Sequence, residues 1–244
     1  MESDLMPKPL QNWTQDERIE AVKSIFNTIT PTYDHMNHIM SAGRDIAWRR
    51  RMIQRLPEGN IKVLDIATGT GDVAIDIKWK RPDIEVAGID FVFRMMEFAQ
   101  QKTRAQNLAI QYMGGDALHL PFPDNSFDAT TIAFGLRNIP DKFAALREMQ
   151  RVVKPGGKVF TLEMTFPRNL KMRAFFTWYL NKMIPILGAT IARDKKAYHY
   201  LAESIQEMIH PDTLSALYEQ VGFQQIKATP LTFGITYLHE GTVA

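Results

Sequence analysis

A glycine-rich turn between a short strand and a helix constrains the fold of this chain more than any other feature. Residues 62–66, KVLDI, are apolar, β-branched and too few for a helix, and Gly69-Thr70-Gly71-Asp72 follows them closely. Residues 73–80 then suit a helix. Glycine permits a tight turn and lets a ligand approach the backbone, while the helix N-terminus offers free N–H groups. The pattern predicts a strand–turn–helix unit with a ligand site at the turn.

The same alternation continues along the chain. Strands are predicted at 85–90, 110–114, 127–134 and 158–163, and helices at 95–106 and 143–153, the last closed by Pro155-Gly156-Gly157. Strands alternating with helices imply right-handed crossovers and a mainly parallel sheet. Two helices are expected before the sheet: one starts near Asp16 behind a Thr14–Glu17 capping box and ends before Pro31, and one covers 46–55.

Length and composition fit one globular domain. The chain has 244 residues, 45% of them hydrophobic and 23% charged, with a formal net charge of +2. This balance gives no reason to expect a nucleic-acid partner. The chain has no cysteine, which excludes disulfides, thiolate metal ligands and a cysteine nucleophile. We see no other metal-ligand cluster. The sequence permits a homo-oligomer.

The N-terminus resembles no targeting signal. MESDLMPKPL carries Glu2 and Asp4 and lacks an apolar run, and no apolar run in the chain approaches the roughly 20 residues that span a bilayer. We therefore expect a cytoplasmic protein, with contact to a membrane surface allowed.

Three interpretations of the glycine turn compete. Gly69 to Ala74 fits the GxGxxG/A pattern that binds the pyrophosphate of a dinucleotide. Asp65 before the turn and Asp72 after it would repel pyrophosphate and attract the sulfonium and ammonium of S-adenosylmethionine. Asp90, which ends the next strand, could then bind both ribose hydroxyls. The third interpretation is a tight turn with no ligand, in which Asp72 is simply an acidic residue of the first helical turn.

The order of the remaining segments favours S-adenosylmethionine. GGDALHLPFPDNSFDATTIAFGLRN places Asp116 after the third strand, where its side chain and the Ala117 amide could read an adenine edge. EMQRVVKPGGKVFTLE then supplies a helix, a turn and the fifth strand. A lone glycine pattern is weak, whereas this ordered set extends over about a hundred residues.

At this point the sequence resembles the UbiE/MenG/Coq5 family of quinone-biosynthesis C-methyltransferases. The stretches that carry the resemblance are YDHMNHIMSAGRDIAW, LDIATGTGD, LPFPDNSFD with TIAFGLRNIPD, RVVKPGGKVFTLEMT and RDKKAYHYLAES, from about Phe26 to near the C-terminus. The resemblance implies an α/β class I S-adenosylmethionine methyltransferase with a Rossmann-like, mostly parallel seven-stranded sheet. We expect one domain: a helical cap over about 1–60, a cofactor-binding core at 61–165, and substrate-side helices with the last strands at 166–244.

The resemblance also implies cofactor contacts at Thr70, Asp90, Asp116 and Ala117. The chain departs from the family pattern at three single positions and again in the stretch SIQEMIHPDTL. Asp45 stands where histidine is usual, and Ala133 and Thr165 each replace a serine. The full set of cofactor-binding residues that we predict is Asp65, Gly69, Thr70, Gly71, Asp90, Asp116, Ala117 and Ala133.

Ring methylation needs an electron-rich carbon, and a hydroquinone qualifies once a hydroxyl begins to lose its proton. We predict Arg137, Asn138 and Tyr200 as catalytic residues. Arg137 and Asn138 follow the fourth strand, where ligands bind in open sheets, and Arg137 could stabilise a developing phenolate. Tyr200 could hydrogen-bond a ring oxygen. The alternatives are a surface arginine near a helix N-terminus and a core tyrosine.

Four further features each have a functional and a structural interpretation. Residues 33–37 could form a lid over the cofactor, or a turn with Asp34 as an N-cap. A histidine could act as a base, although a lone histidine is more often a surface or capping residue. Arg49-Arg50-Arg51, with Arg44 and Arg55, could face anionic lipids or only solvent. The histidines considered are His35, His38, His199, His210 and His239.

The fourth feature is an apolar helix face between Met172 and Leu187. It could pack on the core, line a channel for a polyprenyl tail, or rest on a membrane. The residues placed on this one face are Met172, Phe175, Phe176, Tyr179, Leu180, Met183, Ile184 and Leu187.

The leading hypothesis is C-methylation of a polyprenylated quinol, with demethylmenaquinol ahead of the benzoquinol of the ubiquinone pathway. A second hypothesis keeps the cofactor and changes the acceptor to another aromatic, sterol or natural-product ring. A third is a protein that binds the cofactor without transferring its methyl group. The sequence leaves the tail length and the identity of the base undetermined.

Overall fold

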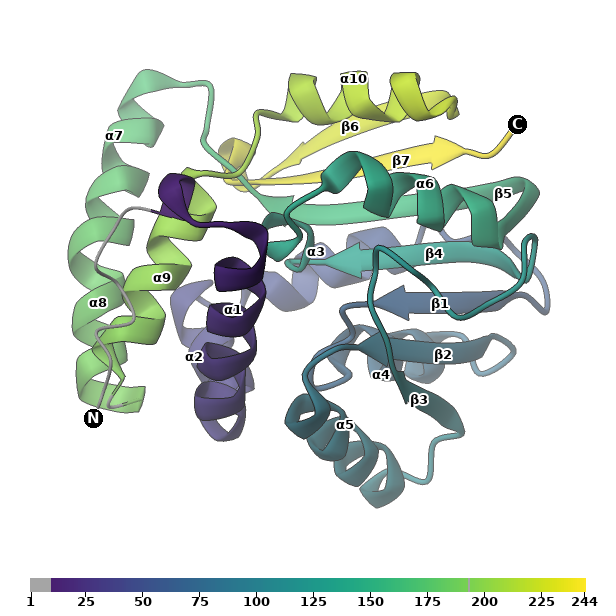
Figure 1. The fold of residues 1–244 in the computed structure, drawn as a ribbon, viewed down its shortest axis with the longest axis horizontal. Helices are drawn as coiled ribbons and strands as arrows, with labels where there is room; N and C mark the ends of the chain where they lie inside the picture. Colours follow the sequence, from purple (N-terminus) through teal and green to yellow (C-terminus); the bar gives the residue numbers. More distant parts are fainter. Residues whose placement is uncertain (1–9, 193) are drawn as a thin grey trace.

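Seven strands form one sheet in the order β3-β2-β1-β4-β5-β7-β6 (Figure 1). The computed structural model describes residues 10–192 and 194–244, so Glu2, Asp4 and Arg193 lie outside it. Every neighbouring pair is parallel except β5 with β7 and β7 with β6. The strands are β1 (Lys62–Ile66), β2 (Glu85–Asp90), β3 (Ile110–Gly114), β4 (Phe127–Ala133), β5 (Val153–Met164), β6 (Gln224–Leu231) and β7 (Thr236–Thr242).

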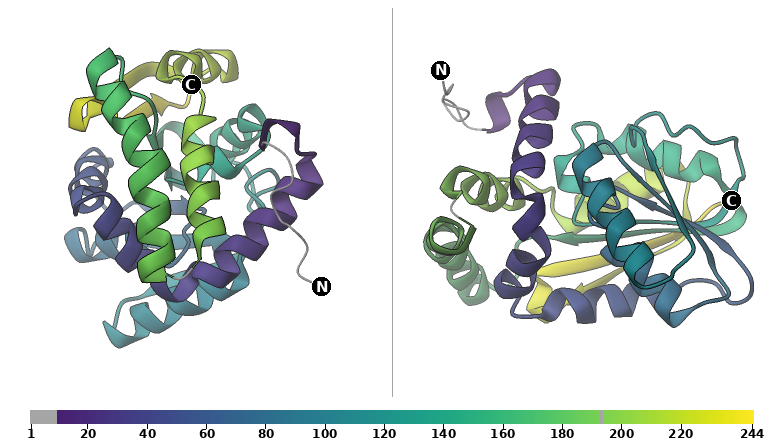
Figure 2. Two further views of the ribbon diagram at one scale, coloured as in Figure 1. Left: turned by 90° about the vertical axis from the view of Figure 1, so that its left-hand side faces the viewer. Right: turned by 90° about the horizontal axis from the view of Figure 1, so that it is seen from below.

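Helices cover both faces of the sheet (Figures 1 and 2). On one face, α3 (Arg44–Ile53) and α4 (Asp72–Lys80) pack with α5 (Phe93–Ala105) nearby, and on the other lie α6 (Lys142–Val152) and α10 (Pro211–Val221). β1 feeds both hydrophobic cores, because alternate strand residues point to opposite faces: Val63 joins the first core, and Leu64 and Ile66 join the second. The predicted α/β fold with a mostly parallel sheet is confirmed.

A third layer of helices lies across the carboxyl ends of the parallel strands (Figure 2). It consists of α1 (Gln15–Ile29), α2 (Tyr33–Met40), α7 (Leu170–Trp178), α8 (Ile184–Leu187) and α9 (Lys195–Gln206). Its own core includes Phe26, Met36, Phe176, Leu180 and Tyr198. Segments from both ends of the chain therefore close the edge of the sheet where ligands usually bind.

The local signals read from the sequence set several boundaries. The predicted capping box is confirmed: Thr14 and Glu17 exchange hydrogen bonds at the start of α1. The Pro155-Gly156-Gly157 turn, predicted before the fifth strand, lies within the bounds of β5 instead. Val153 still pairs with Phe127 before residues 154–157 bulge out, and Gly156 has φ +79° there.

The arginine run is divided: Arg44, Arg50 and Arg51 are exposed, whereas Arg49 and Arg55 are not. Arg49 is buried, and its guanidinium pairs with Asp45, Asp72 and Asp76. Arg55 pairs with Glu240 across 2.7 Å. The lipid-facing hypothesis is therefore wrong for Arg49 and Arg55, whose guanidinium groups bind carboxylates, and stays a prediction for Arg44, Arg50 and Arg51.

The single apolar face predicted between Met172 and Leu187 is divided in the structure. α7 continues through a π-helical turn, η4 (Tyr179–Met183), into α8 and a second π-helical turn, η5 (Gly188–Ala192). Phe176, Leu180 and Ile184 are buried, whereas Phe175 is 55% exposed and lies on the outer side. Within the described residues, no helix has both the length and the apolar character needed to cross a membrane.

Candidate functional site

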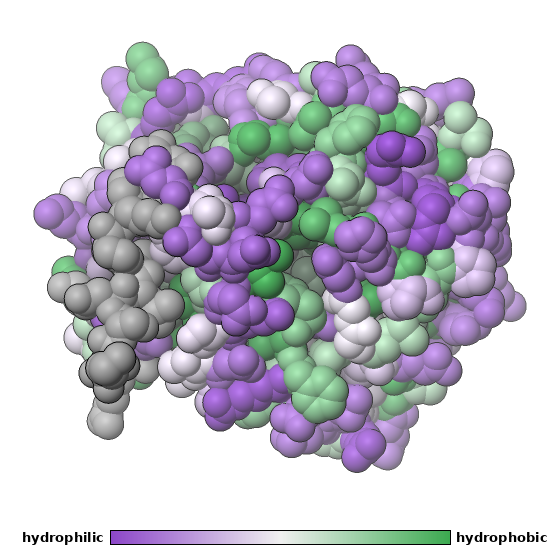
Figure 3. Space-filling view, in the orientation of Figure 1, coloured by the Kyte–Doolittle hydropathy of each residue, from purple (hydrophilic) through white to green (hydrophobic). Residues whose placement is uncertain are grey.

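A cavity opens at the carboxyl edge of the sheet, between the strand ends and α1. Figure 3 shows hydrophobic side chains gathered in a depression on this side, surrounded by hydrophilic ones. From α1, Ile19, Val22 and Phe26 close the cavity. The predicted residues that line this first cavity are Gly69, Asp90, Asp116, Ala117, Ala133 and Asn138.

Asp90 is the best-fixed polar group of the first cavity. One carboxylate oxygen accepts the Gly69 N–H and the other accepts the Val92 N–H, each at 2.8 Å. Burial raises the pKa of Asp90 to about 6, and these backbone hydrogen bonds act in the opposite direction. Each carboxylate oxygen has a second lone pair, so the group can still accept hydrogen bonds from a vicinal diol.

The glycine turn has two glycines with different tasks. Both have positive φ, +57° at Gly69 and +83° at Gly71. Gly69 lines the cavity, whereas a Cβ at Gly71 would lie 2.6 Å from the Tyr112 hydroxyl and 3.0 Å from the Ala99 Cβ. Gly71 thus permits α4 to pack closely against its neighbours, and it does not face the cavity.

Asp65 and Thr70 also lie outside the wall of the first cavity. Asp65 is buried and accepts hydrogen bonds from the Thr68 and Thr131 hydroxyls, both at 2.7 Å. Burial raises the pKa of Asp65 to about 7. The Thr70 hydroxyl donates to Asp34. The predicted contacts of Asp65, Thr70 and Gly71 with the cofactor stay predictions.

A second cavity adjoins the first, and Tyr33 and Phe134 line both. Most of the atomic surface of its wall is apolar, and Met164, Leu180 and Ile184 contribute to it. The polar or charged residues that line it are Tyr33, Asn37, Ser41, Asp45, Trp48, Arg49, Arg137 and Tyr179.

Arg137 lines the second cavity and is 4% exposed, so it is not a surface arginine. Its Nη1 lies 2.6 Å from a Glu163 oxygen. Burial disfavours the charged guanidinium, but the Glu163 carboxylate together with Tyr33 and Tyr200 offsets this, and the pKa of Arg137 is raised. The Arg137 Nε is buried without a hydrogen-bond partner among the described residues. A permanent cation therefore borders this cavity.

Asn138 and Tyr200, both predicted to be catalytic, are in contact in the structure. The Tyr200 hydroxyl donates to the Asn138 Oδ1 at 3.0 Å, and the Tyr200 ring stacks on Trp13. Asn138 lines the first cavity, whereas Tyr200 lies behind it, buried in the helical layer. The five histidines proposed as bases line neither of the two cavities.

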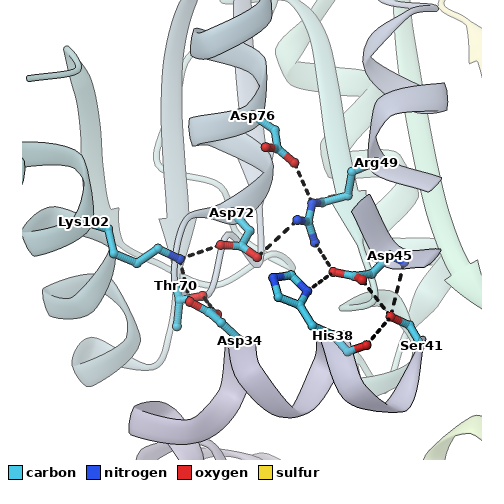
Figure 4. Close-up of polar contacts among 9 residues, drawn as sticks. All are labelled: Asp34, His38, Ser41, Asp45, Arg49, Thr70, Asp72, Asp76 and Lys102. Carbon is cyan, nitrogen blue, oxygen red and sulfur yellow. Dashed lines mark hydrogen bonds and ion pairs between the residues drawn. The ribbon is translucent and has the colours of Figure 1, made fainter. Parts of the chain in front are cut away.

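α2 is held to the glycine turn by the charge network of Figure 4, formed by Asp34, His38, Ser41, Asp45, Arg49, Thr70, Asp72, Asp76 and Lys102. Lys102 binds Asp34 at 2.7 Å and Asp72 at 2.5 Å. The N-cap of α2 is Thr32, so the N-cap interpretation of Asp34 is wrong. The chain is already helical at Thr32, and the Asp34 side chain reaches Thr70 and Lys102 instead.

The Asp45 carboxylate sits at the other end of this network. It accepts from Ser41 at 2.7 Å and from Arg49 at 2.9 Å, and it lies 2.6 Å from the His38 Nδ1. Although burial raises the pKa of Asp45, these three partners outweigh it and the pKa is lowered. Asp45 is thus an ionised group at the wall of the second cavity.

Three residues of the site were missed in the sequence. Ala67 and Phe134 have positive φ, +51° and +58°, although neither is glycine, and both line the first cavity after a strand end. Residues with strained backbone angles are common at binding sites, but no sequence pattern predicts them here. Glu163, the partner of Arg137, had a usable signal: a carboxylate near the end of an otherwise apolar strand, VFTLEM.

The negative charge of the first cavity suits S-adenosylmethionine better than a dinucleotide. Asp90 and Asp116 line it, and Asp34, Asp65 and Asp72 lie around the adjoining turn. Because Lys102 already pairs with Asp34 and Asp72, it is Asp90 and Asp116 in the cavity wall whose charge favours a cation and opposes pyrophosphate. Among the described residues, no group of three or more acidic or histidine side chains is arranged to hold a metal ion.

Comparisons with known proteins identify the family. Residues 12–243 match the ubiE/COQ5 methyltransferase family. The demethylmenaquinone methyltransferase of Deinococcus radiodurans is 40% identical over 228 residues, which cover 93% of this chain and 94% of that protein. The ubiquinone/menaquinone biosynthesis C-methyltransferase UbiE of Shewanella frigidimarina is 40% identical over 232 residues, covering 93% and 92%.

A solved structure supports the fold. The S-adenosylmethionine-dependent methyltransferase of Thermotoga maritima, described as a possible histamine N-methyltransferase, superposes with a TM-score of 0.66 at 19% identity. The match covers 91% of this chain and 99% of that one. The chain therefore belongs to the ubiE/COQ5 methyltransferase family, whose members use S-adenosylmethionine as methyl donor.

Proposed function

We propose that this enzyme methylates a ring carbon of a polyprenylated quinol, with demethylmenaquinol as the preferred substrate. The observation that carries the proposal is the pair of adjoining cavities, one bordered by Asp90 and one by a mostly apolar surface and Arg137. Relatives of similar identity are named demethylmenaquinone methyltransferase, and others UbiE, which favours a quinol of either pathway. The cytoplasmic location expected from the sequence stays a prediction.

In this proposal, Asp90 accepts hydrogen bonds from the ribose hydroxyls of the cofactor, while Asp116 and the Ala117 amide contact the adenine. Gly69 and Ala133, which also line the first cavity, would contact the same cofactor. Bound S-adenosylmethionine supplies an electrophilic methyl group on its sulfonium. Tyr33 and Phe134, shared by both cavities, would hold the quinol ring against the first cavity and exclude water.

Arg137 then acts on the quinol oxygen. As the hydroxyl proton leaves, negative charge grows on that oxygen and on the adjacent ring carbon, which becomes the nucleophile. Arg137 lines the second cavity and Glu163 holds its guanidinium in place, so its positive charge can stabilise the developing phenolate. A group fixed before the reaction stabilises such charge without reorganisation. Asn138, held by Tyr200, would orient the same ring.

The test is turnover of S-adenosylmethionine with a short-chain demethylmenaquinol, compared with the demethylated benzoquinol analogue, both kept reduced. We expect a ring-methylated product by mass spectrometry, formed faster from the naphthoquinol. Preference for the benzoquinol would change the assigned substrate. Cofactor binding without methylation of either ring would overturn the proposal in favour of a different acceptor or of a protein that only binds the cofactor.

A further inference from the structure

The outer side of the helix that runs from α7 through η5 carries large apolar side chains without partners in the core. Phe175, Trp178 and Ile186 are 55%, 52% and 56% exposed, while the inner side buries Phe176 and Ile184. This helix lies at the outside of the helical layer (Figure 2, left). Large exposed aromatic side chains gathered on one element mark an interaction surface.

The exposed residues form one regular stripe. Lys171, Phe175, Trp178, Lys182 and Ile186 are all exposed and follow one another at intervals of four, three, four and four residues along α7, η4 and α8. The Phe175 and Trp178 rings are in contact, with centroids 6.0 Å apart. Two lysines thus flank a pair of aromatic rings. We call these five residues the outer stripe.

The charged residues in the sequence segment that contains the outer stripe have one sign, although Arg168 at its start pairs with Asp212 of α10. No acidic residue occurs between Glu163 and Asp194, whereas that segment holds five basic residues. Lys171 and Lys182 are exposed and have no acidic partner within ion-pair distance among the described residues. A face of this composition attracts anionic surfaces, because no carboxylate on the same helix neutralises its lysines.

We propose that the outer stripe docks this enzyme on an anionic lipid bilayer. Trp178 and Phe175 would enter the interfacial region between head groups and acyl chains, which aromatic rings favour, while the two lysines bind lipid phosphates. A protein partner fits less well, since a specific protein interface centres on aromatic and arginine anchors and is depleted in lysine.

Docking there has a consequence for the second cavity. Tyr179, Leu180 and Ile184, from the same helix, line that cavity on the opposite side. A helix resting on lipid would therefore be one wall of the site for a lipid-soluble quinol. Only this step rests on the function proposed above; the docking surface itself rests on the outer stripe.

The test is co-sedimentation of the full chain with phosphatidylcholine vesicles, with and without 30% phosphatidylglycerol, and without any quinol or cofactor. We expect binding to require phosphatidylglycerol and to weaken at high salt. The double variants Phe175→Ser/Trp178→Ser and Lys171→Gln/Lys182→Gln should each lose at least tenfold in the vesicle partition coefficient. Both should keep wild-type circular dichroism, because all four side chains are exposed.

The matched control is Trp79→Ser/Phe93→Ser, which removes aromatic side chains 61% and 70% exposed on α4 and α5. This control should bind vesicles as the wild type does. Equal loss in the control, binding to pure phosphatidylcholine, or no vesicle binding at all would overturn the proposal. The proposal would also be overturned if wild type did not bind vesicles and an outer-stripe variant changed the oligomeric state, because the outer stripe would then contact a second copy of the chain. Vesicle binding without quinol turnover would refute the proposed function and leave the docking intact.

Discussion

At the scale of single residues, the site depends on two buried charges that face different cavities. Asp90 has only backbone partners and sits at the end of β2, where the chain can aim it into the first cavity. Arg137 has one ionic partner, Glu163, and an unpaired N–H. The first is suited to binding and the second to the transition state, so their variants should separate affinity from rate.

Replacing Asp90 with alanine should weaken S-adenosylmethionine binding by about 1.5–3 kcal/mol, the range for hydrogen bonds to a charged group. Calorimetric titration measures this directly. Glu85→Ala, at the exposed opposite end of the same strand, is the control and should bind normally. Wild-type affinity in the Asp90 variant would remove this residue from the cofactor site. Titration with NAD should give no heat for any of these proteins.

Arg137 needs a paired design, because Arg137→Ala alone would leave Glu163 buried without its counter-ion. Breaking a buried pair in this way costs about 3–5 kcal/mol of stability. The double variant Arg137→Gln/Glu163→Gln removes both charges, leaves two side chains that can hydrogen-bond each other, and should recover most of that loss. We expect its kcat to stay low while its cofactor affinity stays near wild type. Wild-type kcat in the double variant would show that the pair serves only the fold.

At the scale of elements, α2 is attached to its neighbours mainly through polar side-chain contacts, since few of its residues are buried. Its contact with the glycine turn and α5 runs through Asp34, which binds Thr70 and Lys102. The Asp34 and Lys102 side chains are 32% and 27% exposed, so solvent screens their attraction. Tyr33, the first residue of α2, lines both cavities, so its position depends on that of the helix.

Asp34→Ala should therefore loosen α2 without disturbing the sheet. We expect faster amide exchange confined to residues 33–40 and a cofactor dissociation rate raised on the order of tenfold, from the loss of a hydrogen bond and an ion pair. Stopped-flow displacement and hydrogen exchange measure the two effects. Asp83→Ala breaks the exposed pair with Arg81 beyond the far end of α4 and serves as control. If dissociation is unchanged, α2 does not restrain the bound cofactor.

Elements with strong local signals were predictable from the sequence, whereas the contacts among them were not. The Thr14 cap and the short β-branched runs set helix and strand boundaries, and the glycine turn located the first cavity. The pairing of Glu163 with Arg137 was not readable, since it joins residues from two elements. The sequence also did not reveal which residues of α7 face inward. Phe175 and Phe176 are the same residue type, yet the first is exposed and the second is buried.

At the scale of the whole molecule, two buried carboxyl groups oppose stability near neutral pH. Burial raises the pKa of Asp65 to about 7 and that of Asp90 to about 6. The folded state therefore binds protons more tightly than the unfolded chain, in which both groups titrate near pH 4. Between pH 4 and 7 the contribution of these groups to the free energy of unfolding falls as pH rises.

Asp65→Asn should flatten this dependence. The amide keeps partners for the Thr68 and Thr131 hydroxyls, which can rotate to donate or accept, and it carries no charge to desolvate. Urea unfolding between pH 5 and 7.5 should show a smaller loss of stability with pH in the variant than in wild type. Glu97→Gln, an exposed residue of α5, is the control and should keep the wild-type slope. An unchanged slope in Asp65→Asn would mean that Asp65 stays ionised throughout.

The position of β7 has a consequence for synthesis on the ribosome. β7 is the last strand of the sheet to be made, yet it lies between β5 and β6 and is the only strand that pairs with β6. Until residues 236–242 leave the exit tunnel, β5 presents an open edge, and such edges invite pairing with another chain. A nascent chain of this enzyme thus carries an open β5 edge from the time β5 emerges until residues 236–242 emerge, and a holding chaperone matters most in that interval.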